Sequence, residues 1–562
     1  MRMVSAPVQA AANSGIAALL ISLFVCQGLF FIRANSPTYD EAMHLAAGYS
    51  YLATKNFRLE PQNPPLIKMY LAAPLFFVYR LPFDPDPQQW RDRDDFLVGQ
   101  EFLYRSPLDA EKMLFVSRVF NLLLGVCLLA LIGWWSYRLW GMRAALLCLA
   151  LASLEPNLVA HSSLVTGDVG STLLIVASVY LLWEYLSLPQ WRILLGTAAA
   201  IGMAFNAKFS SLILIPTLAA IVATSAHFGS GFRLPRTPPY RPPDNKVIES
   251  GLVLLILFFF ALLTIPAAYF FQGFQWWFSG LIQFSKLARS GQAAFFLGEY
   301  SYDGWWSYFF IAFLIKTPIG TLILLAASLI LHRAGRRLCA RDAIFLFVPV
   351  AMVFVLTSQA KVNIGLRHIL PVYPFLFILA SRLATVRRLW ATTFIIGALA
   401  LTAVSALRIA PHQLAYFNEL IGGPDQGHCY LGDSNIDWGQ DLKALKSYMD
   451  KEKLPIIYLS YFGTAPPSYY KIRHQYVPGA WPLEWPPSAE KVPTDAPRKI
   501  LAISVNNLQD LGMPHNPLFR WLWNRRPVAK IGYSIFIYDF TDDAEALAKL
   551  RETYFKAGLA AP

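Results

Sequence analysis

The chain has 562 residues, of which 56% are hydrophobic and only 15% are charged. Soluble domains carry roughly 25% charged residues, so the composition excludes an ordinary soluble protein and indicates a membrane protein. The net charge of +13 does not point to nucleic acid, because the basic residues sit in short loops between apolar segments. The five cysteines show no paired spacing, so neither a disulfide framework nor a cysteine metal site is predicted.

Long apolar segments predict a polytopic α-helical protein with about eleven transmembrane helices. Each segment reaches or approaches the roughly 20 residues that cross the hydrocarbon core of a bilayer. The first segment is too continuous for a cleaved signal peptide, so we expect it to be retained. The predicted spans are 12–32, 114–137, 143–160, 169–188, 193–205, 209–226, 247–271, 305–331, 342–358, 366–382 and 389–409.

Every second loop between these segments is basic, and this pattern sets the predicted orientation. Lys and Arg concentrate in the cytoplasmic loops of membrane proteins. We therefore expect a cytoplasmic N-terminus and an extracytoplasmic C-terminal segment. The basic loop positions are Arg138, Arg143, Arg192, Arg233, Arg236, Arg241, Lys246, Arg333, Arg336, Arg337, Arg341, Arg382, Arg387 and Arg388.

Three segments on the outer side are unusual. The first outer loop, 33–113, contains an amphipathic stretch from Leu66 to Leu81 that we expect to lie on the membrane surface. The second, 272–304, is rich in aromatic residues, which is typical either of a binding surface or of an aromatic belt at the membrane interface. The third is the tail after residue 410.

The tail reads as a small α/β domain. Three strand-like runs, Ile456–Tyr461, Lys499–Val505 and Ser534–Tyr538, alternate with a helical stretch, Trp438–Met449. The chain is therefore predicted to divide into a transmembrane domain, 1–410, and an extracytoplasmic domain, 411–562.

An adjacent Asp-Glu pair follows directly after the first span. Thr38 is a possible N-cap, and Glu41 three residues later completes a Thr-x-x-Glu capping box. Asp40 is then left without a structural role. Asp40 and His44 are four residues apart, so they share one face of the helix that follows. The alternative reading is a solvated, capped helix start without chemistry.

Several cations sit where the loop pattern does not require them. Ionisable groups at membrane depth are costly and usually mark function, although snorkelling to headgroups explains any single one. Together they predict a basic pocket at the outer leaflet, which suits a phosphate or pyrophosphate. The acidic groups expected on the same side are Asp40, Glu41 and Asp168. The cationic positions are Arg118, Lys208, Lys316, Lys361, Arg367 and His368.

These motifs resemble, in their order and sidedness, the membrane-embedded C-superfamily (GT-C) glycosyltransferases. The resemblance is greatest to the family 39 group, which includes protein O-mannosyltransferases and the lipid A aminoarabinose transferase. It covers roughly the whole membrane part. The matching motifs are Asp40-Glu41, Asn63-Pro64-Pro65-Leu66, Arg118, Thr166-Gly167-Asp168, Ala207-Lys208-Phe209 and Arg367-His368-Ile369-Leu370-Pro371.

The resemblance implies an inverting glycosyltransferase that uses a polyprenyl-phosphate-linked sugar donor at the outer face of a bacterial inner membrane. It implies that Asp40 is the general base and that Glu41 belongs to the same site. It also implies that Arg118 lies near the donor phosphate. We add Lys208, Arg367 and His368 as phosphate-binding candidates, and Asp168 for orienting hydroxyl groups. Further site candidates are His44, Asn63, His161, Lys316 and Lys361.

The cofactor and the acceptor are left open by the sequence. No cofactor is certain: some relatives bind a divalent metal ion near the catalytic acids and others bind none. His44, His161 and His368 are available as ligands, but we favour a polar role at the membrane interface for each of them. The acceptor is a protein, a lipid or a glycan, and membrane lipids are expected partners.

The tail departs from the known acceptor modules of this family. Its run from Leu431 to Asp441 is distinctive and resembles bacterial family 39 proteins of unassigned acceptor. Asp433, Asp437 and Asp441 recur at helical spacing without the glycine and glutamate of a calcium loop. We interpret Asp437 as a helix cap.

Two other functions stay open. Intramembrane charges and broken spans also occur in transporters, so a flippase of lipid-linked sugars is one alternative. A ligase that joins whole glycan chains is another, since it has the same fold.

Overall fold

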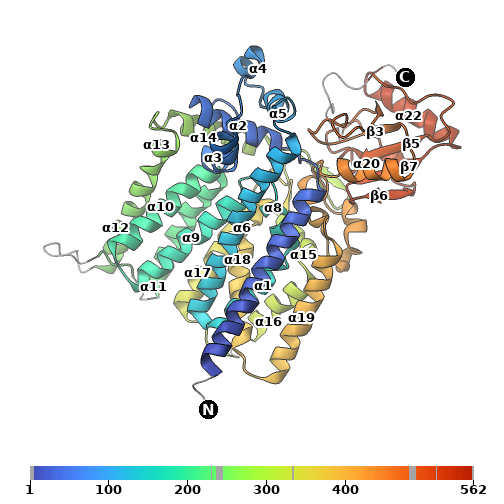
Figure 1. The fold of residues 1–562 in the computed structure, drawn as a ribbon. Helices are drawn as coiled ribbons and strands as arrows, with labels where there is room; N and C mark the ends of the chain where they lie inside the picture. Colours follow the sequence, from blue (N-terminus) through green and yellow to red (C-terminus); the bar gives the residue numbers. More distant parts are fainter. Residues whose placement is uncertain are drawn as a thin grey trace.

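The computed structural model describes residues 5–228, 231–235, 245–331, 335–479, 489–513 and 515–559. A bundle of long helices carries a smaller α/β domain at one end (Figure 1). Three of the basic loop positions, Arg236, Arg241 and Arg333, lie outside the described residues.

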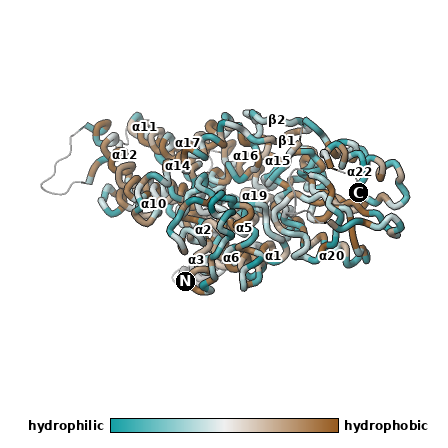
Figure 2. The backbone as a smooth tube through the Cα atoms, turned by 90° about the horizontal axis from the view of Figure 1, so that it is seen from above, coloured by the Kyte–Doolittle hydropathy of each residue, from teal (hydrophilic) through white to brown (hydrophobic). Residues whose placement is uncertain are grey.

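The predicted polytopic helical fold is confirmed. All eleven predicted segments are at least partly helical. Within the described residues, seven helices are long and apolar enough to span a membrane, or nine if each of two bent helix pairs is one span. Seen from above, hydrophobic residues dominate the helices, including α10 to α12 and α17 (Figure 2). The helices of the bundle are α1 (Ser5–Ala34), α6 (Ala110–Trp140), α7 (Met142–Ser153), α8 (Pro156–Ser162), α9 (Asp168–Ser187), α10 (Trp191–Ala207), α11 (Leu214–His227), α12 (Lys246–Leu262), α13 (Thr264–Ala268), α15 (Tyr308–Lys316), α16 (Ile319–Ile330), α17 (Ala340–Thr357), α18 (Val372–Ser381) and α19 (Leu389–Arg408).

Proline residues explain the two bent pairs. Between α7 and α8 the axis turns by 69° just before Pro156, and between α15 and α16 it turns by 112° just before Ile319, at Pro318. Proline lacks a backbone N–H and disfavours a helical conformation in the residue before it, so it ends one helix and starts the next.

The elements of the first outer loop lie together at the end of the bundle opposite the N-terminus (Figure 1). The amphipathic stretch Leu66–Leu81 forms α3 and a π-helical turn that ends at Tyr79. It packs against α2, α6 and α10. The elements of the two long outer loops are α2 (Glu41–Thr54), α3 (Pro65–Pro74), α4 (Pro87–Asp92), α5 (Asp95–Tyr104), α14 (Gln275–Ser290), β1 (Ala294–Phe296) and β2 (Glu299–Ser301).

The tail is an α/β domain, as predicted, with a five-stranded sheet in the order β4-β3-β5-β7-β6. Strand β3 pairs in parallel with β4 and β5, whereas β7 is antiparallel to β5 and β6. Ile500 and Ala502 face the core formed with α20, and their neighbours Leu501 and Ile503 face the core that includes α22. This alternation buries both faces of the sheet. The elements are α20 (Leu442–Lys451), β3 (Ile457–Ser460), β4 (His474–Tyr476), β5 (Ile500–Ser504), α21 (Val505–Leu508), β6 (Ala529–Ile531), β7 (Ile535–Asp539) and α22 (Ala544–Lys556).

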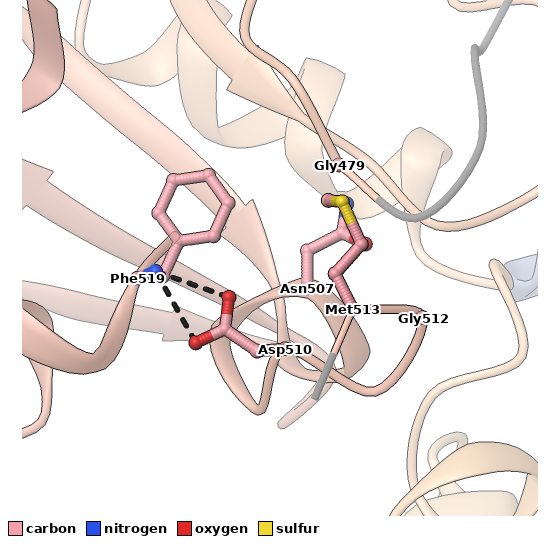
Figure 3. A pocket seen from close by; sticks show the side chains of 6 residues that line it. All are labelled: Gly479, Asn507, Asp510, Gly512, Met513 and Phe519. Atoms are coloured by element: carbon pink, nitrogen blue, oxygen red, sulfur yellow. Dashed lines mark hydrogen bonds between the residues drawn. The ribbon is translucent and has the colours of Figure 1, made fainter. Parts of the chain in front are cut away.

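A small hollow in this domain is shown in Figure 3. The carboxylate of Asp510 accepts hydrogen bonds from the backbone N–H groups of Leu518, at 2.7 Å, and Phe519, at 3.0 Å. The acid therefore stabilises a turn. Among the described residues, the hollow has no room for a water molecule. It is lined by Gly479, Asn507, Asp510, Gly512, Met513 and Phe519.

The predicted helix at Trp438–Met449 begins later, at Leu442, and Asp437 does not cap it. Two backbone bonds explain the difference: Tyr39 N donates to Trp438 O and Ser36 N donates to Gln440 O, each at 2.8 Å. The backbone ahead of α20 pairs with the first outer loop and therefore does not form a helix.

Candidate active site

Asp40 stands at the N-cap position of α2, but its carboxylate makes no capping hydrogen bond. The Nη1 of Arg367 donates to Asp40 Oδ2 at 3.3 Å. The side chain of Asp40 is 24% exposed, so part of the carboxylate stays accessible. Asp40 is therefore an acid without a structural role, as the sequence indicated.

The predicted capping box forms only in part. Thr38 donates to the Glu41 carboxylate from its backbone N–H, at 2.8 Å, and from its hydroxyl, at 3.1 Å. The hydroxyl is thus a donor to Glu41 and not the acceptor for the start of the helix. The reason is that the carboxylate is held in place by a stronger partner, Arg118.

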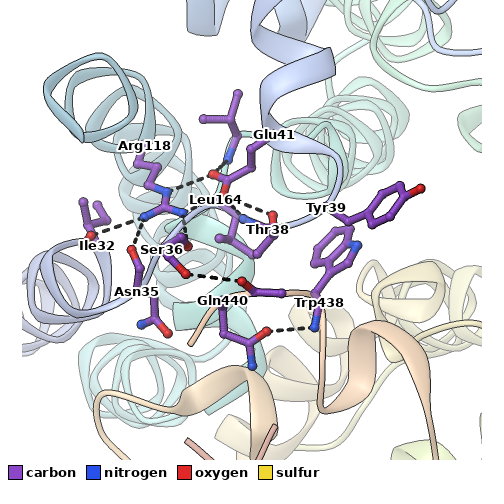
Figure 4. A network of polar contacts seen from close by, with 12 residues as sticks. Ile32, Asn35, Ser36, Thr38, Tyr39, Glu41, Arg118, Leu164, Trp438 and Gln440 are labelled. Atoms are coloured by element: carbon purple, nitrogen blue, oxygen red, sulfur yellow. Dashed lines mark hydrogen bonds and ion pairs between the residues drawn. The ribbon is translucent and has the colours of Figure 1, made fainter. Parts of the chain in front are cut away.

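Glu41 and Arg118 form a fully buried ion pair (Figure 4). Arg118 Nε donates to Glu41 Oε1 at 2.8 Å and Nη2 donates to Oε2 at 2.5 Å. The remaining guanidinium N–H groups donate to the backbone oxygens of Ile32, Asn35 and Ser36. All five N–H donors of Arg118 are therefore used within the protein.

This geometry does not support the expected phosphate role of Arg118, because no donor is left for a phosphate oxygen. Glu41 is equally committed, since it also accepts the backbone N–H of Val165 at 2.7 Å. Burial opposes ionisation of Glu41, but Arg118 and the surrounding donors hold its pKa below the usual value. The pair fixes the acidic loop onto α6 and onto the turn before α9.

The second acid of the site is Asp168, at the start of α9. It is buried and forms an ion pair with Lys208, which follows the end of α10 in an extended conformation. The positive charge of Arg367 lies close enough to interact with the carboxylates of both Asp168 and Asp40. The structure thus brings together acids and cations from the first outer loop, from the break after α10 and from the turn before α18, as the sequence predicted.

Several buried polar atoms around this cluster have no hydrogen-bond partner in the described part of the chain. They are Nε of Arg367, Nε2 of His368, Nδ1 of His161 and Oγ1 of Thr166. Buried polar groups in proteins are nearly always paired. Donors and acceptors left open beside two ion pairs are what a polar ligand, such as a phosphate or a sugar, requires.

The tail contributes residues to the site that the sequence did not assign. The guanidinium of Arg367 lies over the ring of Trp438, 4.1 Å from its centroid. Asp433 is a further buried acid near Arg367 and Asp40, and burial raises its pKa to about 6 despite the opposing charge of Arg367. The feature of the sequence that pointed to these tail residues was the distinctive run from Leu431 to Asp441.

The other candidates have different surroundings. Lys316 is buried and donates to three backbone oxygens, of Leu414, Tyr416 and Asn435, so it has no donor left for a ligand. Lys361 forms an exposed ion pair with Asp303.

Two candidates lie in the first outer loop. His44 Nδ1 is 2.7 Å from Glu60 Oε2. Burial lowers the pKa of His44, but the Glu60 carboxylate outweighs burial and raises it overall. Asn63 is half-buried, and its backbone N–H donates to Glu60 O.

Among the described residues, no group of three or more His, Cys, Asp or Glu side chains is arranged to hold a metal ion. The three candidate histidines His44, His161 and His368 do not form such a group.

Comparison with known proteins gives one family match. Residues 110–233 match the family described as dolichyl-phosphate-mannose-protein mannosyltransferase. This segment contains Arg118, Asp168 and Lys208. No curated protein matches the chain.

Solved structures of other proteins are similar at low identity. ArnT from Cupriavidus metallidurans in the apo state is 13% identical, with a TM-score of 0.48, over 94% of this chain and 98% of that one. The structure of the same protein bound to undecaprenyl phosphate is also 13% identical, with a TM-score of 0.46, over the same shares of the two chains. The Archaeoglobus fulgidus oligosaccharyltransferase complex with Zn and sulfate is 13% identical, with a TM-score of 0.39, over 77% of this chain and 55% of that one. The family match at residues 110–233 confirms the resemblance to the membrane-embedded glycosyltransferases that the sequence motifs indicated.

Proposed function

We propose that this protein is an inverting glycosyltransferase that moves a sugar from a polyprenyl-phosphate-linked donor to an acceptor hydroxyl. Two independent observations support the proposal. The family match concerns transfer from a lipid-phosphate sugar. The cluster around Asp40 supplies an accessible carboxylate paired with Arg367, the neighbouring ion pair of Asp168 and Lys208, and several unpartnered polar atoms.

The observation that carries the proposal is the difference between Asp40 and Glu41. Both are acids at the start of α2, yet Glu41 is fully buried and its oxygens are saturated, whereas Asp40 has one hydrogen-bonded partner and partial exposure. A general base needs a free lone pair within reach of the acceptor proton. Only Asp40 of this pair provides one.

In the proposed reaction, the acceptor oxygen attacks the anomeric carbon from the face opposite the phosphate. The proton of the acceptor hydroxyl moves to Asp40 as the new carbon–oxygen bond forms. The bond between the anomeric carbon and the phosphate oxygen breaks, and the polyprenyl phosphate leaves with the electron pair. The configuration at the anomeric carbon is inverted.

The leaving phosphate needs cations that are not already saturated. Lys208 and Arg367 each have N–H groups left after their ion pairs, and His368 has an open ring nitrogen. Fixed cations in a site that excludes water stabilise developing negative charge. Asp168 holds Lys208 in place and is suited to orient hydroxyl groups of the sugar or the acceptor.

Asp40 precedes α2, and α2 lies at the end of the bundle opposite the N-terminus (Figure 1). The basic loops favour a cytoplasmic N-terminus. We therefore place the reaction at the extracytoplasmic face of a bacterial inner membrane, where a protein, a lipid or a glycan is the acceptor.

The test is transfer of radiolabelled sugar by purified protein in vesicles that contain polyprenyl-phosphate sugars and membrane extract. General-base catalysis contributes about 10²–10⁴-fold, so Asp40→Asn is expected to lower kcat by that factor. Asp303→Asn, at an exposed ion pair, is the matched control. Sugar that only crosses the vesicle membrane without entering product would instead show a flippase. Full activity of Asp40→Asn would overturn the assignment of the base.

A further inference from the structure

We propose that the tail segment Leu431–Asp441 completes the transfer site, with Trp438 as the positioning residue that holds Arg367 against Asp40. The inference rests on the proposed function, but its geometry is independent of the substrate. Trp438 is 2% exposed, and its ring lies under the Arg367 guanidinium, with 4.1 Å between the guanidinium carbon and the ring centroid. The same guanidinium reaches Asp40.

One side of this segment is fastened to the loop that carries Asp40. Tyr39 N donates to Trp438 O and Ser36 N donates to Gln440 O, both at 2.8 Å (Figure 4). The Ser36 hydroxyl also bonds to Gly439 O at 3.2 Å. The backbone on each side of Trp438 therefore moves with the residues that lead into α2.

The other side of the segment is fastened to the turn that carries Arg367. Leu366 N donates to Asn435 Oδ1 at 3.0 Å, and the Ser434 hydroxyl donates to Ile364 O at 2.7 Å. Gly365 is in close contact with Ser434, since a Cβ on Gly365 would lie 2.3 Å from the Ser434 hydroxyl. The segment is a bridge between two elements that are more than 300 residues apart in sequence.

Charge explains why such a bridge is needed. Arg367 has three acidic neighbours, Asp40, Asp168 and Asp433, and any of them attracts it. An aromatic face attracts a guanidinium and restricts it to one plane. With Trp438 on one side, Nη1 donates to Asp40, and Nε has no hydrogen-bond partner among the described residues. The tail thus decides which acid Arg367 contacts.

The experiment compares Trp438→Phe, which keeps an aromatic face, with Trp438→Leu, which keeps apolar bulk alone. A misplacement near 1 Å costs about 10²-fold in rate, so Trp438→Leu is expected to lower kcat by roughly that factor with little change in the acceptor KM. Trp438→Phe is expected to restore most of the activity. Trp306→Leu, at a tryptophan that is 73% exposed, is the matched control.

A double variant separates positioning from general packing. If Trp438 acts through Arg367, then Trp438→Leu combined with Arg367→Ala is no slower than Arg367→Ala alone. Multiplicative losses, or equal damage by Trp438→Phe and Trp438→Leu, would overturn the inference.

A second readout does not depend on transfer. The intact, detergent-solubilised protein is labelled with phenylglyoxal, and the label on Arg367 is measured by mass spectrometry of peptides. Labelling of Arg367 is expected to rise in Trp438→Leu and to stay unchanged in Trp438→Phe. If the wild-type protein transfers no sugar, the proposed function fails while this labelling still tests the bridge. Unchanged labelling in Trp438→Leu would refute the positioning role. If Trp438→Leu does not fold, Trp438→Met takes its place, because methionine also keeps apolar bulk without an aromatic ring.

Discussion

Two neighbouring acids at the start of α2 have opposite roles because of their surroundings. Glu41 faces inward and shares a buried, bidentate ion pair with Arg118. Asp40 faces the cluster of Lys208, Arg367 and Asp168 and keeps an accessible oxygen. One residue is thus structural and the other is suited to chemistry, although both were assigned to catalysis from the sequence.

Glu41→Gln tests this division. Removing one charge of a buried pair leaves Arg118 without a counter-ion and typically costs 3–5 kcal/mol, so we expect loss of folded protein in addition to loss of activity. Asp40→Asn is expected to lose activity while unfolding at the wild-type temperature. Thermal unfolding in detergent, followed by size-exclusion chromatography, measures the difference. A Glu41→Gln variant with normal stability would contradict the structural role.

Asp437 gives a pH-dependent prediction. Burial raises the pKa of this carboxyl to about 8, although the backbone N–H groups of Asn506 and Gly439 oppose the shift. Between the ordinary pKa, about 3.9, and 8 the folded state binds a proton that the unfolded state releases. The stability contributed by this group therefore falls as pH rises across that window, by at most about 1.4 kcal/mol per unit.

Asp437→Asn removes the titration and keeps one oxygen as an acceptor. The unfolding temperature of the variant relative to wild type is expected to increase from pH 5 to pH 8. Thermal scans at both pH values measure it, and a difference that is independent of pH would contradict the assignment.

At the scale of elements, the site is built where helices break. Lys208 follows the end of α10, and Arg367 lies in the short turn before α18. Asp168 starts α9 directly after the turn at Val165. Irregular backbone at membrane depth is tolerated only where it is buried in protein or lines a cavity. The breaks turn polar side chains toward one end of the bundle.

The contact between α16 and α19 shows how closely these elements pack. A Cβ added to Gly320 would lie 2.0 Å from the backbone oxygen of Ala398, whereas one added to Gly397 would meet nothing within 4 Å. Gly320→Ala is therefore expected to force α16 and α19 apart and to lower the unfolding temperature. Gly397→Ala, one residue from the contact, is the control and is expected to be tolerated. Equal stability of the two variants would contradict this packing.

At the scale of the whole molecule, the tail and the membrane part form one structure. Lys316, at the end of α15, reaches three backbone oxygens that follow the last helix of the bundle. A second link, the ion pair of Lys443 and Glu111, is partly exposed. The first link is buried and the second is not, so the two links contribute differently to the stability of the contact between tail and bundle.

Lys316→Met is expected to leave three buried carbonyl groups without donors, each at a cost of about 1–3 kcal/mol, and to detach the tail from the bundle. Lys443→Met is the control, because exposed ion pairs contribute about 0–1 kcal/mol. Limited proteolysis of the tail in detergent measures the effect. Equal protease resistance of Lys316→Met and wild type would show that the buried lysine does not hold the two parts together.

Much of the site was predictable from residue type and order. The sequence predicted that one site contains Asp40, Asp168, Lys208 and Arg367, and the structure brings them together. The reason is that charged side chains are costly at membrane depth unless they pair with one another. The roles of Arg118 and Lys316 were not predictable. Whether a buried cation has a donor left depends on which backbone oxygens surround it, and those come from distant segments.

The sequence by itself determined the membrane class, the helical segments, the α/β tail and the set of charged residues in the site. It did so because hydrophobic length and charge placement act locally along the chain. Only the tertiary structure decided that Glu41 is spent on Arg118, that α20 starts at Leu442 and that Trp438 lies under Arg367. The first outcome depends on contact between the first outer loop and α6, and the other two depend on backbone pairing between that loop and the tail. Contacts across such separations leave no periodic pattern in the sequence.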